Sequence, residues 1–172
     1  ALDAHLVMQF EPRGMGDAVL RFENSPVASV ANHILLAWGD ISHLQISTVS
    51  TLAQSHIDCD NDFTFVTRLV DRAYTQVQRD RTGRVVAVSE TREQGVKDPQ
   101  PGEREIGLFA FRKQPVFDML RADLPGKLGS FTGEHGFLYV IEHLARSGAK
   151  VAALPIATKL DLASLNSLSD LS

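Results

Sequence analysis

Apolar and polar positions alternate along the chain in short blocks, and these blocks predict strands and helices in turn. Short apolar or β-rich runs bounded by turn residues predict strands at residues 6–9, 33–38, 63–70, 106–111 and 150–155. The run at 33–38 is mostly apolar and stops at Gly39-Asp40. We therefore expect this strand to be buried on both faces, as strands of a parallel sheet are.

Apolar residues at helical spacing predict helices between these strands. In the clearest one, residues 137–145, Phe137, Val140, Ile141 and Leu144 follow the i, i+3, i+4, i+7 pattern, and a Ser-Gly pair ends the helix. A helix is also expected to open at Pro115, because proline suits the first helical turn. Rougher patterns predict helices at residues 16–23, 41–56 and 162–171.

One hairpin interrupts this alternation. Residues 74–79 alternate, residues 80–83 have turn chemistry, and residues 84–88 form a second β-rich run. Gly83 suits such a turn because glycine readily takes a positive φ. Two segments rich in proline or glycine, 94–103 and 123–133, are expected to be loops. The pattern predicts an α/β fold with a mixed, mostly parallel sheet flanked by helices and an inserted β-hairpin.

Composition narrows the possible partners. The 172 residues suit a single domain, and an apolar fraction of 44% is enough to form a core. A formal net charge of −4 gives no electrostatic footprint for nucleic acid. A single cysteine, Cys59, excludes an internal disulfide. Without a signal-peptide pattern or an apolar stretch near the ~18 residues that span a bilayer, we expect a cytoplasmic protein with no nucleic-acid or membrane partner.

Asp40 is the first candidate for chemistry. It directly follows a predicted strand, and ligands of open α/β folds bind at the carboxyl edge of the sheet. A carboxylate there can hold Mg²⁺, which takes one or two carboxylates together with phosphate oxygens and water. The alternative is that Asp40 only caps the helix predicted to follow it.

The segment from Gln9 to Ala18 is the second candidate. A predicted strand ends at Gln9, a loop containing Gly14 and Gly16 follows, and a helix then begins. The glycines permit a close backbone approach to a ligand, and the helix N-terminus offers free N–H groups. The glutamine amide pairs a donor with an acceptor, which suits a nucleobase edge. The alternative is an ordinary turn before a helix.

The remaining polar residues suggest no site. None of the six histidines has the spacing of a metal-ligand motif, so we expect surface or satisfied core positions for them. For His135 and His143, which lie eight residues apart, we expect solvent-facing or capping roles. Residues 58–62 resemble the start of a Ca²⁺ loop, but the later glycine and glutamate of such a loop are missing, which favours a solvated turn.

Taken in order, several short motifs resemble the sugar-1-phosphate nucleotidyltransferases, nearest to the uridylyltransferase domain that makes UDP-N-acetylglucosamine. The resemblance covers nearly the whole chain and depends on the order of the motifs. They are Gln9 with Gly14 and Met15, Gly39-Asp40, Tyr74-Thr75, Glu90 at the end of the hairpin, Glu105-Ile106-Gly107, Gly133-Glu134 before a helix, and Leu165-Asn166.

The resemblance implies a Rossmann-like fold of the nucleotide-diphospho-sugar transferase type. It implies transfer of a nucleotidyl group from a nucleoside triphosphate, here UTP, to a sugar 1-phosphate, with release of pyrophosphate and with Mg²⁺ as cofactor. It also implies that residues 1–172 form one domain truncated at its N-terminus, since the family's glycine-rich phosphate loop would precede Ala1.

The resemblance assigns roles residue by residue. Three residues would bind the nucleotide: Gln9, Gly14 and Met15. Three would bind the sugar: Thr75, Glu90 and Gly107. Asp40 and Asn166 would be the catalytic pair that shares the Mg²⁺ ion.

Some residues depart from the family pattern. Met15 stands where the family has threonine, Thr75 where it has glycine, and Glu105 where it has asparagine. Leu138-Tyr139 replaces a Thr-Asp pair. A carboxylate at position 105 would repel a sugar phosphate. Two alternatives therefore stay open: a non-catalytic relative that binds nucleotide or sugar phosphate, and an unrelated α/β domain in which Asp40 is only a cap.

Overall fold

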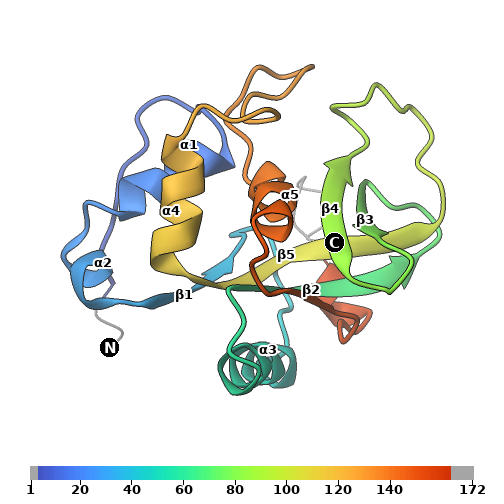
Figure 1. The fold of residues 1–172 in the computed structure, drawn as a ribbon, viewed down its shortest axis with the longest axis horizontal. Helices are drawn as coiled ribbons and strands as arrows, with labels where there is room; N and C mark the ends of the chain where they lie inside the picture. The colour runs from blue at the N-terminus through green and yellow to red at the C-terminus, as the bar shows by residue number, and fades with distance from the viewer. Residues whose placement is uncertain (1–3, 164–172) are drawn as a thin grey trace.

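A four-stranded sheet lies at the centre of the computed structural model, which describes residues 4–163 (Figure 1). The elements in chain order are α1 (Met15–Phe22), α2 (Pro26–Val30), β1 (His33–Ala37), α3 (Ile46–Asp58), β2 (Phe63–Val70), β3 (Thr75–Arg79), β4 (Val85–Glu90), β5 (Gly102–Arg112), α4 (Lys113–Arg121), α5 (Tyr139–Arg146), β6 (Val151–Leu154) and a 3₁₀ turn, η1 (Leu160–Leu162).

The sheet has the order β1-β5-β2-β6 and is mixed. β5 runs antiparallel to both β1 and β2, whereas β2 and β6 are parallel. The prediction of a mostly parallel sheet is therefore wrong, although the α/β class is correct. The connection from β2 to β5 consists of the hairpin β3–β4 and a loop and contains no helix, whereas β6, the parallel neighbour of β2, follows the helices α4 and α5.

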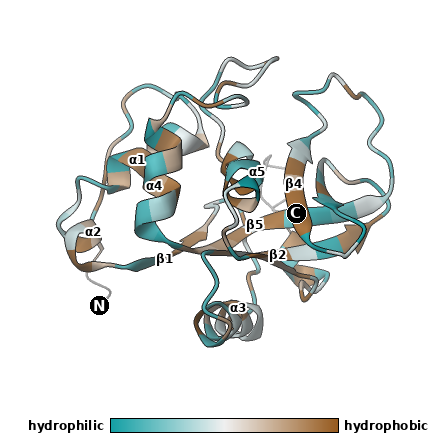
Figure 2. Cartoon of the chain, viewed as in Figure 1, coloured by the Kyte–Doolittle hydropathy of each residue, from teal (hydrophilic) through white to brown (hydrophobic). Residues whose placement is uncertain are grey.

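The two central strands, β2 and β5, explain the strongest apolar runs in the sequence. Phe63 and Phe65 of β2 and Phe109 and Phe111 of β5 pack on one face against α1, α4 and α5. Leu108 and Ala110, which alternate with these phenylalanines on β5, pack on the other face with Leu52 of α3 (Figure 1). Both faces are thus apolar, and Figure 2 shows β5 brown along much of its length.

β1 differs from its prediction. It has the predicted position, but His33, Leu35 and Ala37 are exposed, so it is not buried on both faces. The reason is that β1 lies at the edge of the sheet, with β5 as its one neighbour among the described strands. An apolar run by itself cannot distinguish a central strand from an edge strand.

Helices α1, α4 and α5 lie within two residues or so of their predicted positions, but two other predictions are wrong. α3 begins at Ile46, not at residue 41. Residues 6–9 form no strand, and Leu6 is 90% exposed. The helix predicted at 162–171 lies almost wholly outside the described residues. No helix in the described part of the chain is long and apolar enough to cross a membrane.

The predicted hairpin is confirmed as β3 and β4, which pair antiparallel. Gly83 takes a φ of 85° in the turn, as expected. The Asp80 carboxylate accepts hydrogen bonds from the hydroxyl and N–H groups of Thr82 and from the N–H of Arg84, and these bonds hold the Asp80 pKa well below its usual range. Arg79 of β3 pairs with Glu103 of β5 at 2.8 Å, which ties the hairpin to the sheet.

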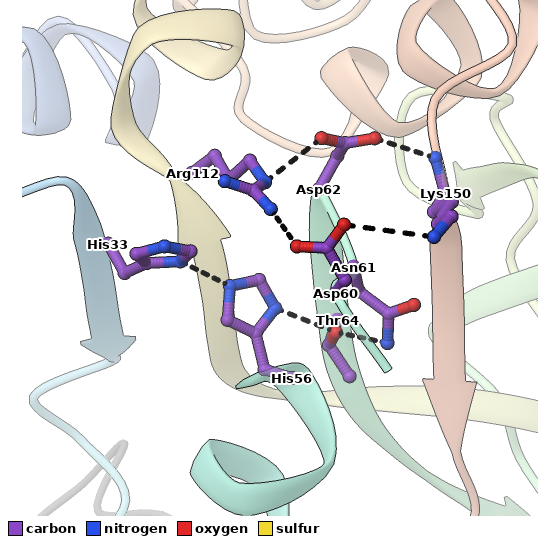
Figure 3. A network of polar contacts seen from close by, with 8 residues as sticks. All are labelled: His33, His56, Asp60, Asn61, Asp62, Thr64, Arg112 and Lys150. Carbon is purple, nitrogen blue, oxygen red and sulfur yellow. Dashed lines mark hydrogen bonds and ion pairs between the residues drawn. The ribbon is translucent and has the colours of Figure 1, made fainter. Parts of the chain in front are cut away.

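A polar network joins α3 and the strands where β1, β2 and β6 begin and β5 ends (Figure 3). His33 Nδ1 lies 3.0 Å from His56 Nε2, and His56 Nδ1 lies 2.9 Å from the Thr64 hydroxyl. Arg112 pairs with Asp60 and with Asp62. Because β1 runs from His33 towards Asp40, this network lies at the opposite end of the strand from the predicted site.

Candidate functional site

A cavity of about 540 Å³ lies beside the end of β1, the end of β4, the loop at 126–136 and the start of α5. Its walls include Met15, Trp38, Glu90, His135 and Tyr139. Met15 was assigned to the nucleotide and Glu90 to the sugar, so the structure brings one residue of each predicted group into the same cavity.

Gly107 does not line this cavity, because Trp38 covers it. The backbone N–H of Trp38 donates to the Gly107 carbonyl oxygen at 2.9 Å. Gly107 has a φ of 80°, and a Cβ added there would lie 2.7–2.9 Å from atoms of the Trp38 ring. Glycine is therefore required at position 107 for two reasons, a positive φ and direct contact with an indole.

Thr75 and Glu105, which both depart from the family pattern, contact each other and do not line the cavity. Glu105 is 1% exposed, and its carboxyl accepts hydrogen bonds from the Gly107 N–H at 2.5 Å and from the Thr75 hydroxyl at 3.3 Å. Burial raises the pKa of Glu105 to about 7, even though the Gly107 bond opposes the shift. The two departures thus form one buried, internally hydrogen-bonded pair.

Gln9 uses its amide nitrogen within the chain. Nε2 donates to the Gly14 carbonyl oxygen at 3.1 Å and to the Asp17 carboxylate at 2.7 Å. Asp17 also accepts from Arg21, and these two hydrogen bonds lower the Asp17 pKa. The side-chain amide oxygen of Gln9, Oε1, has no hydrogen-bond partner among residues 4–163 and is free to accept one from a ligand.

The close approach predicted at Gly14 and Gly16 is present, but it is an approach to the chain itself. The Gly16 N–H donates to the His135 carbonyl oxygen at 2.9 Å. A Cβ would lie 2.4 Å from the His135 oxygen if added at Gly14, and 2.2 Å from the Gly136 oxygen if added at Gly16. At these two glycines, the start of α1 packs directly against residues 134–136 of the cavity wall.

His135 and Tyr139 form a hydrogen-bonded pair in this wall. His135 Nε2 lies 3.3 Å from the Tyr139 hydroxyl, which donates to the Met119 carbonyl oxygen. Nε2 therefore carries the proton and donates to the tyrosine. Burial and the nearby Lys127 lower the His135 pKa, so the ring is neutral at pH 7. The expectation of a solvent-facing or capping role for His135 is therefore wrong, because its ring is buried against Gly16 of α1. Burial also raises the Tyr139 pKa to about 12.

The ionisable groups of the cavity are mostly acidic: Glu90, Glu93, Glu134 and Glu142, against Arg92. Burial raises the pKa of Glu90, and the charge of Glu93 adds to the shift. With His135 neutral, the walls carry an excess of negative charge. Such walls favour a ligand rich in hydroxyl groups and disfavour phosphate, because like charges repel strongly in a partly buried site.

Asp40 lies in the turn after β1 and is not a helix cap. α3 begins six residues later, and Asp161 accepts from the N–H of Gln45, the residue before this helix, at 2.8 Å and from the Thr48 hydroxyl at 2.9 Å. The Asp40 carboxylate has no hydrogen-bond partner within the described range. Asn166, its predicted partner, lies outside that range. Among residues 4–163 there is no group of three or more His, Cys, Asp or Glu side chains that could hold a metal.

The sequence-based reasoning missed Trp38, His135 and Tyr139 as cavity residues. A usable signal existed for Trp38 alone, because the single tryptophan of the chain stands directly before Gly39-Asp40. His135 and Tyr139 reach the cavity only through the packing of residues 134–136 against the loop before α1.

Comparison with known proteins gives one consistent result. No family model matches the chain. The chain is 27% identical over 170 residues to the bifunctional protein GlmU of Pelotomaculum thermopropionicum, covering 95% of the chain and 35% of that protein. It is 25% identical to the proteins of the same name from Lactobacillus johnsonii and Heliobacterium modesticaldum, covering 32% and 34% of them. The chain thus resembles bifunctional GlmU proteins over about a third of their length.

Proposed function

We propose that this chain forms part of a nucleotidyltransferase that transfers a uridylyl group from UTP to a sugar 1-phosphate and releases pyrophosphate. The observation that supports this proposal best is the similarity to GlmU proteins along 95% of the chain. A second support is the cavity, in which Met15 and Glu90 meet although they are far apart in sequence.

The negative charge of the cavity walls suggests which part of the proposed substrates would bind inside the cavity and which part outside it. The acidic walls suit the sugar ring, whose hydroxyl groups can donate to Glu90. The phosphates would lie towards Asp40 and the loop that contains Gln9 and Gly14, outside these walls. In the transfer, an oxygen of the sugar phosphate attacks the α-phosphorus and pyrophosphate leaves, so the chain needs to hold the two reactants in line.

Mg²⁺ fits the residues at the end of β1. Magnesium sites beside phosphates use few protein ligands, so an unpaired Asp40 carboxylate suits such a site better than a closed cluster would. Asp40 would hold the ion together with Asn166. When bound, the ion would neutralise charge that develops on the phosphate oxygens.

Pyrophosphate release tests this function. The protein is incubated with UTP, MgCl₂ and several hexose 1-phosphates, and pyrophosphate is measured. We expect turnover with at least one sugar, and a loss of about a hundredfold in Asp40→Asn, because one metal ligand is worth several kcal/mol in such reactions. Asp58→Asn, at the exposed end of α3, is the matched control and should keep full activity.

A non-catalytic binding protein is the second candidate. It is favoured by the Trp38 ring that covers Gly107 and by the buried Thr75–Glu105 pair. Calorimetric binding of UDP-sugars or UTP, without pyrophosphate release from any pair of substrates, would establish this function instead of the first.

A further inference from the structure

Two histidines and a buried threonine form a chain of hydrogen bonds at the end of β1 opposite the cavity (Figure 3). His33 stands exposed at the start of β1, and its Nδ1 lies 3.0 Å from His56 Nε2 on α3. His56 is 2% exposed, and its Nδ1 lies 2.9 Å from the Thr64 hydroxyl on β2. The side-chain amide of Asn61 donates to the same hydroxyl at 3.1 Å. The contacts therefore run without a break from solvent to a fully buried threonine.

The hydrogens of this chain can be placed by counting the donors of each group. The Thr64 hydroxyl has one hydrogen and accepts from Asn61, and His56 is its one other partner among residues 4–163. The hydroxyl therefore donates to His56 Nδ1, because a buried hydroxyl without an acceptor is costly. The neutral His56 ring then carries its proton on Nε2 and donates to His33 Nδ1. All the bonds thus run in one direction, from Asn61 to His33.

An added proton is incompatible with this direction. If His33 takes it, both ring nitrogens of His33 carry hydrogen, and its Nδ1–H faces the Nε2–H of His56. If His56 takes it, Nδ1–H points at the Thr64 oxygen, and the hydroxyl hydrogen then has no acceptor in the described part of the chain. Reversing the bond between the two rings leaves Thr64 in the same state, because His56 must then carry its proton on Nδ1. Each way of adding a proton therefore costs one hydrogen bond.

Burial decides which of the two rings takes the proton. It lowers the pKa of His56, and the charges of His33 and Arg112 lower it further. Asp60 and Asp62 act in the opposite direction, but both carboxylates pair with Arg112. The exposed His33 ring can keep a new charge in contact with water. It is therefore the ring that is protonated first as pH falls.

The surroundings of His33 then favour its release from α3. His33 lines a surface hollow of about 370 Å³ with Arg112 and Lys113, and no carboxylate of the described residues lines this hollow. Lys113 is held there, because its ammonium group donates to the Ala28 carbonyl oxygen at 2.6 Å. A cationic His33 thus meets two cations on one side and the Nε2–H of His56 on the other, and both repel it.

We propose that His33 and His56 form a pH-sensitive latch, in which the hydrogen bond from His56 Nε2 to His33 Nδ1 holds the start of β1 against the last turn of α3 at neutral pH and breaks when His33 takes a proton. The proton comes from solvent and stays on Nδ1 of His33, whose ring turns outward into water. His56 stays neutral and keeps its bond from Thr64, while its uncovered Nε2–H donates to water. The latch lies outside the proposed catalytic site and does not depend on the proposed function.

Histidine nitrogen spectra test the direction of the chain. Long-range ¹H–¹⁵N spectra of the whole protein distinguish a bare ring nitrogen from a protonated one, and His33→Gln and His56→Gln identify the two sets of signals among the six histidines. At pH 7.5 we expect a bare Nδ1 and a protonated Nε2 in both rings. On acidification through the ordinary histidine pKa of about 6.5, His33 should gain its second proton before His56 does. A His56 ring protonated on Nδ1 at pH 7.5 would overturn the proposal.

Hydrogen exchange at the end of α3 tests the release itself. The Cys59 N–H donates to the Ser55 carbonyl oxygen, and the Asn61 N–H donates to that of His56. After correction for the intrinsic pH dependence of exchange, these amides should exchange about tenfold faster at pH 5.5 than at pH 7.5, which is the effect of one lost hydrogen bond. Amides of the central strand β5 should show no such change, which separates release of the latch from unfolding of the whole chain.

His33→Gln separates the latch from a general effect of acid. The glutamine oxygen can accept from His56 Nε2–H but takes no proton in this pH range, so the tenfold change should disappear. His5→Gln, at an exposed position outside the network, is the matched control and should keep the change. Thr64→Ser retains the hydroxyl and should keep the Nε2–H form of His56. An unchanged pH response in His33→Gln, or none in the unsubstituted protein, would overturn the latch and leave the nucleotidyltransferase proposal standing.

Discussion

A substitution at Glu105 tests whether burial of its carboxyl in the Thr75–Glu105 pair costs stability when that carboxyl ionises. Its carboxyl is 1% exposed and has a pKa of about 7, against an ordinary value of 4.5. Replacing it with glutamine should preserve both contacts, because the amide oxygen can accept from the Gly107 N–H and the amide nitrogen can donate to the Thr75 hydroxyl. The substitution removes only the ability to ionise.

The size of the effect follows from the pKa shift and depends on pH. Below pH 4.5 the carboxyl is protonated in both the folded and the unfolded state, so folding carries no cost. Between pH 4.5 and 7 the unfolded state ionises first, so the free energy of unfolding falls as pH rises. Above pH 7 the loss reaches roughly 3 kcal/mol, at about 1.4 kcal/mol for each pKa unit. Glu105→Gln should therefore be more stable than the unsubstituted protein by about 3 kcal/mol at pH 8, and by less than about 1 kcal/mol at pH 5.

Urea unfolding at pH 5 and at pH 8 measures this difference, with tryptophan fluorescence as the probe. Glu11→Gln, at an exposed position, is the control and should show no pH-dependent gain. An equal change at both pH values, or a loss of stability at pH 8, would refute the argument that Glu105 is buried and costly to ionise.

Three further predictions concern stability. Burial lowers the pKa of His56 below 6.5, and the charge of the neighbouring His33 adds to this shift. The free energy of unfolding should therefore fall as pH falls from 6.5 through the lowered pKa. His56→Gln should flatten this pH dependence, which urea titrations at a series of pH values measure. Gly16→Ala puts a Cβ 2.2 Å from the Gly136 oxygen and should cost about 1–3 kcal/mol or more in thermal unfolding. Gly39→Ala, with no atom within 4 Å of the new Cβ, should stay within about 0.5 kcal/mol, and equal losses in the two variants would contradict the packing argument. Asp161→Ala removes the acceptor for the Gln45 N–H and for the Thr48 hydroxyl at the start of α3 and should cost about 2 kcal/mol, which the same unfolding assay measures.

Local patterns predicted those elements whose cause is local. The hairpin at Gly83 follows from turn chemistry and alternation, and α5 follows from apolar spacing ended by a Ser-Gly pair. The prediction at 6–9 failed because a short apolar run becomes a strand only when another strand pairs with it, and no described strand does so. Partners in a sheet are set by long-range contacts that periodicity does not contain.

The same distinction between local patterns and long-range contacts applies to the candidate site. Residue type and spacing pointed to Asp40 and Gln9, because these are local properties of the sequence, and the family resemblance added Glu90. It also showed that positions 75 and 105 depart from the family pattern, but not that the two residues contact each other.

The sequence by itself determined the α/β class, the hairpin, the positions of the apolar strands and the order of the candidate motifs. Only the tertiary structure decided that most strand pairs in the sheet are antiparallel, that β1 lies at its edge, and that Trp38 covers Gly107 beside an acidic cavity. The physical reason is that propensity and periodicity act over a few residues, whereas strand direction, burial of an ionisable group and the walls of a cavity depend on which distant segments meet.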